Sequence, residues 1–217
     1  MSEFHFYEPH LGHGLPHDPF KAIVAPRPIG WISSLSTAGG VNLAPYSFFN
    51  AFCERPPIVG FSSGGKKDSQ RNIEATGEFV VNLATKKHAQ QMNLTSAAVA
   101  PDVNEMELAG LVAAPCRLVK PPRIADAPAA LECKLLQVIP QKDLDGRPTP
   151  NTLILGQVVG VHIDEAYLVH GIFDLRLAHP IARCGYLADY AEVTSLFEMI
   201  RPTVESLASI TSGKTKE

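Results

Sequence analysis

A short loop rich in glycine and serine, flanked by a strand-like run and a helix-like run, constrains the fold of this chain more than any other feature. The apolar residues 57–61 precede the loop and predict a buried strand. The loop and the turns that follow it occupy residues 62–73. Asp68 or Ser69 is placed to act as the N-cap of a short helix, and Gly77 lies just past the predicted end of that helix. The chain therefore passes directly from a sheet into a helix at this loop.

The order strand, glycine loop, helix is typical of a phosphate-binding site, because exposed amides and the positive end of the helix dipole face the same point. Gly60, Gly65 and Lys66 match the spacing of a nucleotide-binding P-loop. Lys67, however, stands where a Ser or Thr must hold magnesium. Two lysines in a loop can also be simply solvated. Their place between a glycine pair and an N-cap favours a phosphate-binding role over this alternative. The sequence excludes ATP and GTP and predicts a phosphate-bearing cofactor held without a metal.

A predicted hairpin precedes this unit. Residues 25–34 and 42–49 are apolar runs, broken by proline and seeded with serine, on either side of a glycine-containing turn at residues 38–40. This pattern predicts two antiparallel strands. Pro45 cannot donate to a sheet ladder, so we expect strand pairing to be interrupted there. Such an interruption leaves neighbouring amides and carbonyls free to meet a flat, hydrogen-bonding ring.

Three motifs, in order and at family-like intervals, give the chain a resemblance to a known family. They are Pro-Arg-Pro-Ile-Gly-Trp-Ile-Ser (residues 26–33), Asn-Leu-Ala-Pro-Tyr-Ser-Phe-Phe-Asn (42–50), and Lys-Asp-Ser with Asn-Ile (67–69 and 72–73). From about residue 6 to residue 202, including residues 156–162, the chain resembles the flavin reductase-like family. The resemblance implies a mostly β fold with peripheral helices, an FMN-binding split β-barrel, and FMN as the cofactor.

The resemblance also implies which residues contact FMN. It implies that amides and hydroxyls contact the ring and ribityl chain around Ser33, Ala44, Tyr46 and Ser47. It implies that the phosphate is bound by Ser62, Ser63, Lys67 and Ser69. The full predicted cofactor-binding set is Trp31, Ile32, Ser33, Ser34, Ala44, Pro45, Tyr46, Ser47, Ser62, Ser63, Lys67, Asp68, Ser69 and Asn72. No side chain is expected to act as a catalytic acid or base, because the cofactor carries the chemistry.

Some of these residues suit a purely structural role equally well. Trp31, the only tryptophan, fits core packing as well as flavin contact. Tyr46 and Phe48 are similarly divided, and Arg27 and Asn72 can pin loops. The serines are stronger candidates, because buried hydroxyls need hydrogen-bond partners.

The rest of the chain predicts further strands and peripheral helices. Strands are expected over residues 78–84, 131–139 and 151–164, the last two joined by a turn at residues 145–146. Helical segments are expected over residues 85–96, 104–111 and 189–200, and fraying over 212–217. Gly156 and Gly160 fall on one face of their strand, where a backbone or a ligand can approach closely. Strands joined by hairpins, with helices outside, predict a small closed barrel.

The composition fits one globular domain over residues 1–217, with a partly flexible tail from about residue 203. Hydrophobic residues make up 45% and charged residues 19% of the chain, which excludes a disordered protein. The net charge of −3 gives no attraction to nucleic acid or an anionic membrane. The sequence shows neither a leader pattern nor an apolar run of membrane-spanning length, so we expect a cytoplasmic protein.

We also expect a homodimer. The aromatic residues Tyr46, Phe48, Phe49 and Phe52 offer more apolar surface than one small barrel readily hides. Related split barrels place flavin near a subunit boundary, and a closed two-fold is the commonest form of association.

No metal site is predicted. His10, His13 and His17 lie close together in sequence, but glycine and proline between them break any regular element. The cysteines have no Cys-x-x-Cys spacing, so buried free thiols are expected at Cys53, Cys116, Cys133 and Cys184. His88, Asp126 and the serines form no catalytic triad that the sequence supports.

These inferences predict an FMN-binding oxidoreductase and leave three hypotheses open. The first is an NAD(P)H-dependent flavin reductase, with NADH or NADPH as co-substrate, which could supply reduced flavin to a partner oxygenase. The second is an electron-transfer flavoprotein that takes electrons from a redox protein and has no nicotinamide site. The third is a non-catalytic FMN-binding module. Nicotinamide recognition in this family has no short motif that would choose among them.

Overall fold

The computed structural model describes residues 3–204. Its strands are β1 (Arg27–Pro28), β2 (Gly30–Leu35), β3 (Val41–Tyr46), β4 (Phe49–Glu54), β5 (Pro57–Gly64), β6 (Glu78–Leu83), β7 (Ala113–Ala114), β8 (Arg123–Ile124), β9 (Ala129–Lys142), β10 (Pro148–Ile163), β11 (Leu168–Val169), β12 (Ile172–Phe173), β13 (Ile181–Arg183) and β14 (Tyr190–Glu192). Its α-helices are α1 (Phe20–Ile23), α2 (Asp68–Thr76), α3 (Ala89–Leu94), α4 (Glu105–Leu108) and α5 (Leu175–Ala178). Short 3-10 helices are η1 (Pro9–Leu11), η2 (Lys86–His88) and η3 (Glu165–Tyr167).

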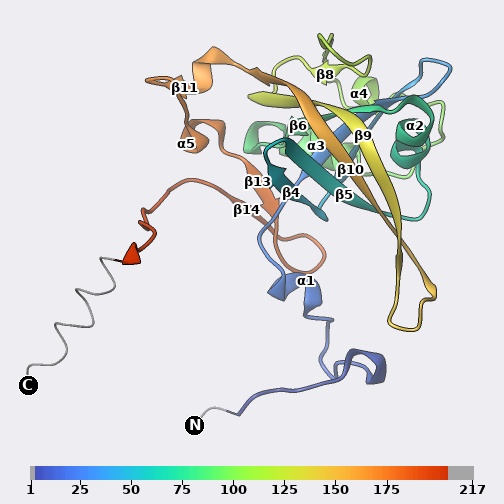
Figure 1. The fold of residues 1–217 in the computed structure, drawn as a ribbon, viewed down its shortest axis with the longest axis vertical. Helices are drawn as coiled ribbons and strands as arrows, with labels where there is room; N and C mark the ends of the chain where they lie inside the picture. Colours follow the sequence, from blue (N-terminus) through green and yellow to red (C-terminus); the bar gives the residue numbers. More distant parts are fainter. Residues whose placement is uncertain (1–2, 205–217) are drawn as a thin grey trace, which may run out of the picture.

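The largest sheet closes into a barrel. It is antiparallel, with the strand order β3-β2-β6-β9-β10-β5-β4. β3 and β4 lie at opposite ends of this order, yet only Ser47 and Phe48 separate them in the chain. Two residues cannot span an open sheet of seven strands, because neighbouring strands lie about 4.8 Å apart. The sheet therefore curls until its two edges meet, and Figure 1 shows the resulting barrel with α2 beside it.

The predicted hairpin is confirmed, and one detail of it is corrected. β2 and β3 pair around a turn in which Gly39 has a φ of 87° and the Ser36 N–H donates to the Gly40 carbonyl at 2.8 Å. The expected interruption at Pro45 is wrong, because the register is unshifted on both sides of the Trp31–Pro45 pair. β3 has only one neighbour in the sheet order. A proline in such an edge strand can turn its missing donor outwards without breaking the ladder.

The predicted strand–loop–helix unit is also present, with a change at the start of the helix. β5 leads through Gly65, whose φ is 77°, into α2, and Gly77 ends that helix in the left-handed conformation. The N-cap is Lys67, not Asp68 or Ser69, and no side chain caps the helix. Asp68 lies in the first turn instead, where its charge still meets the positive end of the helix dipole.

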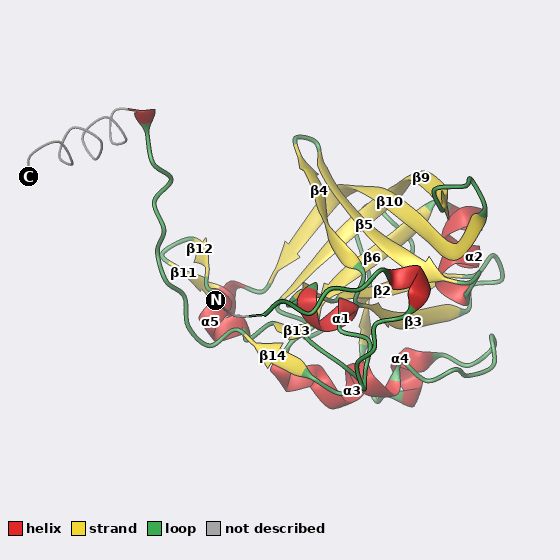
Figure 2. Cartoon of the chain, turned by 90° about the horizontal axis from the view of Figure 1, so that it is seen from below, coloured by secondary structure: helices red, strands yellow, loops and turns green. Residues whose placement is uncertain are grey.

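Two groups of buried side chains pack on either side of the β2–β3 hairpin. The barrel interior contains Ile32, Phe61, Phe79 and Ile154, with Ile73 packed from α2. The outer group contains Trp31, Leu43, Met92, Met106 and Ile124. Figure 2 shows α3 and α4 on the side of the barrel formed by β2 and β3, from which they contribute the two methionines.

Glycines in the barrel strands make room for protein side chains. The predicted strands 131–139 and 151–164 are present and are longer at one or both ends, as β9 and β10. A Cβ on Gly156 would lie 2.4 Å from the Phe79 ring, and one on Gly160 would lie 3.2 Å from the carboxyl carbon of Glu132. Neither glycine lines the larger cavity described below. Close packing within the fold therefore accounts for both.

The predicted helix over residues 189–200 is wrong. Residues 190–192 form β14, which pairs with β13, and residues 193–203 have no regular structure. β13 also pairs with β1, so a small sheet ties the segment after the barrel to the segment before it. A helix from residue 189 would lose this pairing, which a local pattern cannot reveal. Residues 212–217 lie outside the described residues, as does the tail from 205 onwards.

The predicted strand over residues 78–84 is present as β6. The helical segments expected over residues 85–96 and 104–111 are present in shorter form, as η2 with α3 and as α4. No helix within residues 3–204 has the length and apolarity to cross a membrane. The cytoplasmic location stays a prediction.

Candidate functional site

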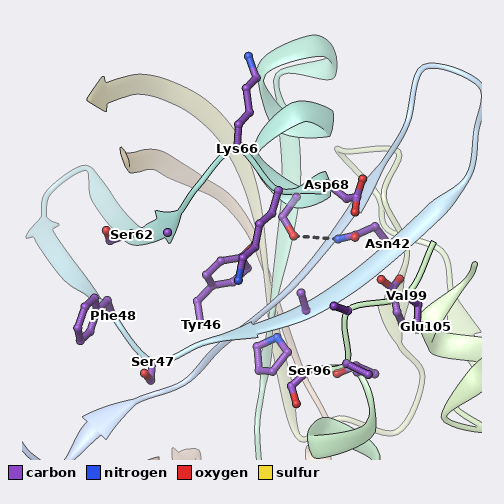
Figure 3. A pocket seen from close by; sticks show the side chains of 18 of the residues that line it. Asn42, Tyr46, Ser47, Phe48, Ser62, Lys66, Asp68, Ser96, Val99 and Glu105 are labelled. Atoms are coloured by element: carbon purple, nitrogen blue, oxygen red, sulfur yellow. Dashed lines mark hydrogen bonds between the residues drawn. The ribbon is translucent and has the colours of Figure 1, made fainter. Parts of the chain in front are cut away.

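A cavity of about 700 Å³ lies between the β5–α2 loop, the end of β3 and residues 95–99 (Figure 3). It brings together the two sequence segments expected to bind phosphate and ring. The predicted residues that line it are Ala44, Pro45, Tyr46, Ser47, Ser62, Lys67, Asp68 and Ser69.

A buried network of amides and hydroxyls joins β3 to α2 beside this cavity. Asn42 Nδ2 donates to Ser69 Oγ at 2.8 Å and to Ser34 Oγ at 3.4 Å. Asn72 Nδ2 donates to the same Ser34 oxygen at 3.3 Å. Ser34 and Asn72 thus support the cavity from behind, whereas Asn42 and Ser69 line it. Asn42 was missed by the sequence prediction, although it opens the 42–50 motif.

Tyr46 lines the cavity and carries an unpartnered hydroxyl. Its ring is buried and packs against Phe61, with the ring centroids 4.5 Å apart. Burial raises the pKa of the Tyr46 phenol, so the hydroxyl keeps its proton at neutral pH. This buried hydroxyl makes no hydrogen bond of good geometry among the described residues, although the Ser69 and Ser63 side chains lie near enough to oppose part of the rise in its pKa. Because an unsatisfied buried polar group costs roughly 1–3 kcal/mol, a ligand acceptor that reached it would be stabilised there.

The two lysines of the loop have different partners. Lys66 Nζ lies 2.5 Å from the Glu74 carboxylate, and this hydrogen bond lowers the pKa of Glu74. Figure 3 shows Lys66 pointing away from Tyr46 and Asn42. Lys67 lines the cavity at the N-cap of α2 and forms no ion pair within residues 3–204. The first amides of a helix also lack intrahelical acceptors. Lys67 and the start of α2 therefore form a cationic end of the cavity.

The sequence prediction missed an acidic residue in the same cavity. Glu105 begins α4, whose N-cap Asn104 accepts hydrogen bonds from two backbone N–H groups of that helix. The Glu105 residue is 6% exposed, and its carboxylate accepts the Leu43 N–H at 3.0 Å. Burial raises the pKa of Glu105, and no cation of the described chain forms an ion pair with it. Figure 3 shows Glu105 beside Val99. The contact between α4 and β3 places it here, so no local pattern marks it.

The remaining predicted residues have buried side chains that do not line the cavity. The Trp31 indole N–H donates to Thr95 Oγ1 at 2.9 Å, and Ile32 lies in the barrel core. Ser33 Oγ donates to the Pro122 carbonyl at 2.6 Å, and Ser63 Oγ donates to the Gly65 carbonyl at 2.9 Å. The Trp31 side chain thus packs in the core, which is the structural role considered for it above. Contact of a cofactor with the backbone of these residues stays a prediction.

One triad-like arrangement is present, but its hydroxyl and its histidine are buried and only its aspartate is exposed. His88 Nε2 lies 3.1 Å from Asp126, and His88 Nδ1 lies 3.5 Å from Thr85 Oγ1. Thr85 and His88 are 1% and 3% exposed, so a substrate cannot reach the hydroxyl. The arrangement anchors η2 to the loop that carries Asp126.

A family model described as "Flavin reductase like domain" matches residues 24–172. The chain belongs to the flavin reductase-like family. The resemblance inferred from the three motifs is confirmed, and so is the mostly β, split-barrel fold.

Solved structures of the flavin reductase-like type share the fold over most of the chain. Nitrilotriacetate monooxygenase component B from Bacillus cereus is 30% identical, with a TM-score of 0.77, covering 83% of this chain and 90% of that one. The 2-nitrobenzoate 2-nitroreductase of Pseudomonas fluorescens is also 30% identical, with a TM-score of 0.74 and coverage of 85% and 89%. An uncharacterised protein of Halalkalibacterium halodurans is 35% identical over 186 residues, which are 83% of this chain and 88% of that protein.

Proposed function

We propose that this protein binds FMN in the 700 Å³ cavity and accepts hydride from NADH or NADPH as a flavin oxidoreductase. The observation that carries the proposal is the combination, in one cavity, of an unpaired lysine at a helix start with a buried, unpartnered tyrosine hydroxyl. Lys67 fits a phosphate, and the Tyr46 hydroxyl fits an acceptor atom of a bound ring or ribityl chain. The donor set suits FMN without a metal.

The residues of this chain would hold and orient the cofactor. Ser62, Lys67 and Ser69 would bind the phosphate, supported by the first amides of α2. The backbone and side chains from Ala44 to Ser47 would face the ring. FMN, when bound, supplies the hydride-accepting ring. The chain's own contribution is to position the ring, leave one face open to a donor and keep the phosphate charge paired.

Two different physiological acceptors are supported by the similar proteins. Nitrilotriacetate monooxygenase component B favours a reductase that works with a partner oxygenase. The 2-nitrobenzoate 2-nitroreductase favours direct reduction of a small organic substrate in the same cavity. Both require a reduced flavin, so hydride acceptance from a nicotinamide is the step to test first.

The test is anaerobic stopped-flow with protein saturated with FMN. We expect the absorption of oxidised flavin to disappear with a saturable dependence on NADH or NADPH, and deuterium at the transferred position to slow this phase if chemistry limits it. Hydride transfer needs the donor carbon and the flavin N5 within roughly 3–3.5 Å. Rapid reduction by a redox protein, but by neither nicotinamide, would instead support the electron-transfer hypothesis. Reduction by neither donor would support the binding-module hypothesis. Addition of a nitroaromatic to the reduced protein then distinguishes the two acceptors.

A further inference from the structure

A second cavity, of about 550 Å³, lies beside the later part of β10 and the loop between β7 and β9. It shares no lining residue with the cavity proposed for FMN. Figure 1 shows this region of the barrel around β8, β9 and β10. Its lining includes Glu132 from β9 and His162 from β10.

Three side chains of metal-ligand type lie together at the wall of this cavity, which Glu132 and His162 line and behind which Cys116 lies. The sulfur of Cys116, a carboxylate oxygen of Glu132 and a ring nitrogen of His162 all lie within 4.8 Å of one another. The closest pair is His162 Nε2 and Glu132 Oε1, which are 2.5 Å apart. The residues are separated by 16 and 30 positions in the chain, and for that reason no sequence spacing predicts the group.

Three backbone N–H groups hold the Glu132 carboxylate in a fixed position. The side chain is 1% exposed. Its Oε1 accepts the Arg117 N–H at 2.9 Å, and its Oε2 accepts the Leu118 and Val119 N–H groups at 2.6 and 3.0 Å. Gly160 lies opposite Glu132 in the β9–β10 ladder, and a Cβ there would press on the carboxyl carbon at 3.2 Å. A buried, fixed carboxylate with a histidine and a thiol beside it is a preformed donor set.

The β10 strand is locally irregular at this point. The β9–β10 register shifts between Val158 and Gly160, two residues before His162. Irregularities of this kind re-aim side chains and occur often beside functional sites. Here the shift brings His162 to the same carboxylate that anchors the loop carrying Cys116.

We propose that Cys116, Glu132 and His162 bind a zinc-type divalent metal ion, with the fourth coordination position open to the cavity. Sulfur, imidazole and carboxylate together suit Zn²⁺, and three protein ligands with an open position are its usual arrangement at sites that hold water. Bonds of about 2.0–2.3 Å place tetrahedral ligand atoms roughly 3.3–3.8 Å apart, a modest adjustment of the present spacing. On binding, the proton of the Cys116 thiol and any proton on His162 Nε2 are released to solvent, while the sulfur and the ring nitrogen bind the metal.

The other charged side chains that line this cavity are Arg117, Arg123 and Asp164, so the attraction for a cation comes from the three ligand groups themselves. The Arg123 guanidinium donates to the Ala125 carbonyl at 3.0 Å, which holds that cation within its own loop. A metal would cross-link this loop to β9 and β10. It would therefore stabilise the side of the barrel away from the flavin cavity.

The test uses tag-free, FMN-saturated protein in which His10, His13 and His17 are replaced by alanine. These histidines contact Glu8, the Leu15 N–H and the Tyr186 ring, respectively, and removing them eliminates an unrelated source of zinc binding. The protein is treated with a chelator, titrated with ZnCl2 in a calorimeter, and analysed for zinc after dialysis. We expect one equivalent of retained zinc. Zinc should also slow alkylation of Cys116, measured by mass spectrometry, and leave Cys184 unaffected.

Two ligand variants and two matched controls complete the experiment. Loss of an outer-shell partner alone weakens metal binding roughly 10–100-fold, so Cys116→Ser and His162→Gln should each weaken zinc binding at least that much. Cys184→Ser and His179→Gln should bind zinc as the parent does. Bound flavin in each variant reports that the barrel is folded. Retention of no zinc by the parent, or equal zinc binding in both ligand variants, would overturn the proposal.

Discussion

Lys66 and Lys67 are neighbours in the chain, but their partners predict different contributions to cofactor binding. Both lysines line the proposed FMN cavity, but Lys67 forms no ion pair with another described residue, whereas Lys66 is paired with Glu74. We expect Lys67→Ala to weaken FMN binding by roughly 1–3 kcal/mol, because it removes a charge-assisted bond to phosphate. Lys66→Ala is the matched control and should have a smaller effect. Fluorescence titration at physiological salt measures both, and wild-type affinity in the Lys67 variant would show that the phosphate lies elsewhere.

Glu105 makes the stability of the protein depend on pH in a predictable direction. Its pKa is raised by burial, so the folded state holds this proton more tightly than the unfolded state does. Stability should therefore fall as the pH rises from the ordinary glutamate value through the raised one. Glu105→Gln keeps an oxygen for the Leu43 N–H but cannot ionise. We expect the stability of the variant not to show the decrease with pH that Glu105 contributes. Above that pH window, the variant should therefore be more stable than the parent.

Urea unfolding at several pH values measures this effect in cofactor-free protein. Glu165→Gln is a suitable control, because Glu165 is exposed on η3. If the stability of the Glu105 variant ran parallel to that of the parent at every pH, the carboxyl would not be titrating as the burial implies.

At the scale of elements, the parts of the fold that the sequence predicted are those with local signals. The turn at Gly39 and the left-handed end of α2 at Gly77 carry glycines at positions of positive φ, so both elements were found. Glu105 meets the cavity only through the contact between α4 and β3, so no local pattern marks it, whereas Asn42 stands in a motif that the sequence prediction had already singled out. The segment from residue 189 has a helical pattern, but pairing between β13 and β14 decides its structure. Elements marked by local turn and cap residues were predicted correctly, whereas structure that depends on contacts between distant segments was not.

The packing of β10 against β6 gives a prediction about barrel stability. A Cβ on Gly156 would lie 2.4 Å from the Phe79 ring, which is fully buried and cannot move freely. We expect Gly156→Ala to destabilise the protein by about 1–3 kcal/mol, as overpacking of a core usually does. Gly64→Ala is the control, because its added Cβ meets nothing within 4 Å and its φ is not positive. Urea unfolding without cofactor compares them, and equal midpoints would mean that the barrel yields at this position.

At the scale of the whole molecule, apolar side chains extend beyond the barrel. Figures 1 and 2 show the segments before β1 and after β14 leaving the compact body of the fold. Phe6 and Phe197 on these segments are each 83% exposed, and Phe52 on β4 is 55% exposed. Of the aromatic run expected to drive association, Tyr46 is buried in the core, so the exposed part consists of Phe48 and Phe52. Large apolar groups exposed to this extent are candidates for burial on association.

We therefore predict a homodimer in which β4 and the terminal segments contact a second copy of the chain. Sedimentation velocity at micromolar concentration should show a dimer, and Phe52→Ser or Phe197→Ser should raise its dissociation constant by about tenfold or more, since buried aromatics commonly dominate interface energy. Leu144→Ser is the matched control, because Leu144 is fully exposed but stands at the tip of the β9–β10 turn, away from these aromatic residues. It should leave the dimer unchanged. A flavin-loaded monomer at this concentration would contradict the prediction, because the exposed phenylalanines would then have no partner to cover them.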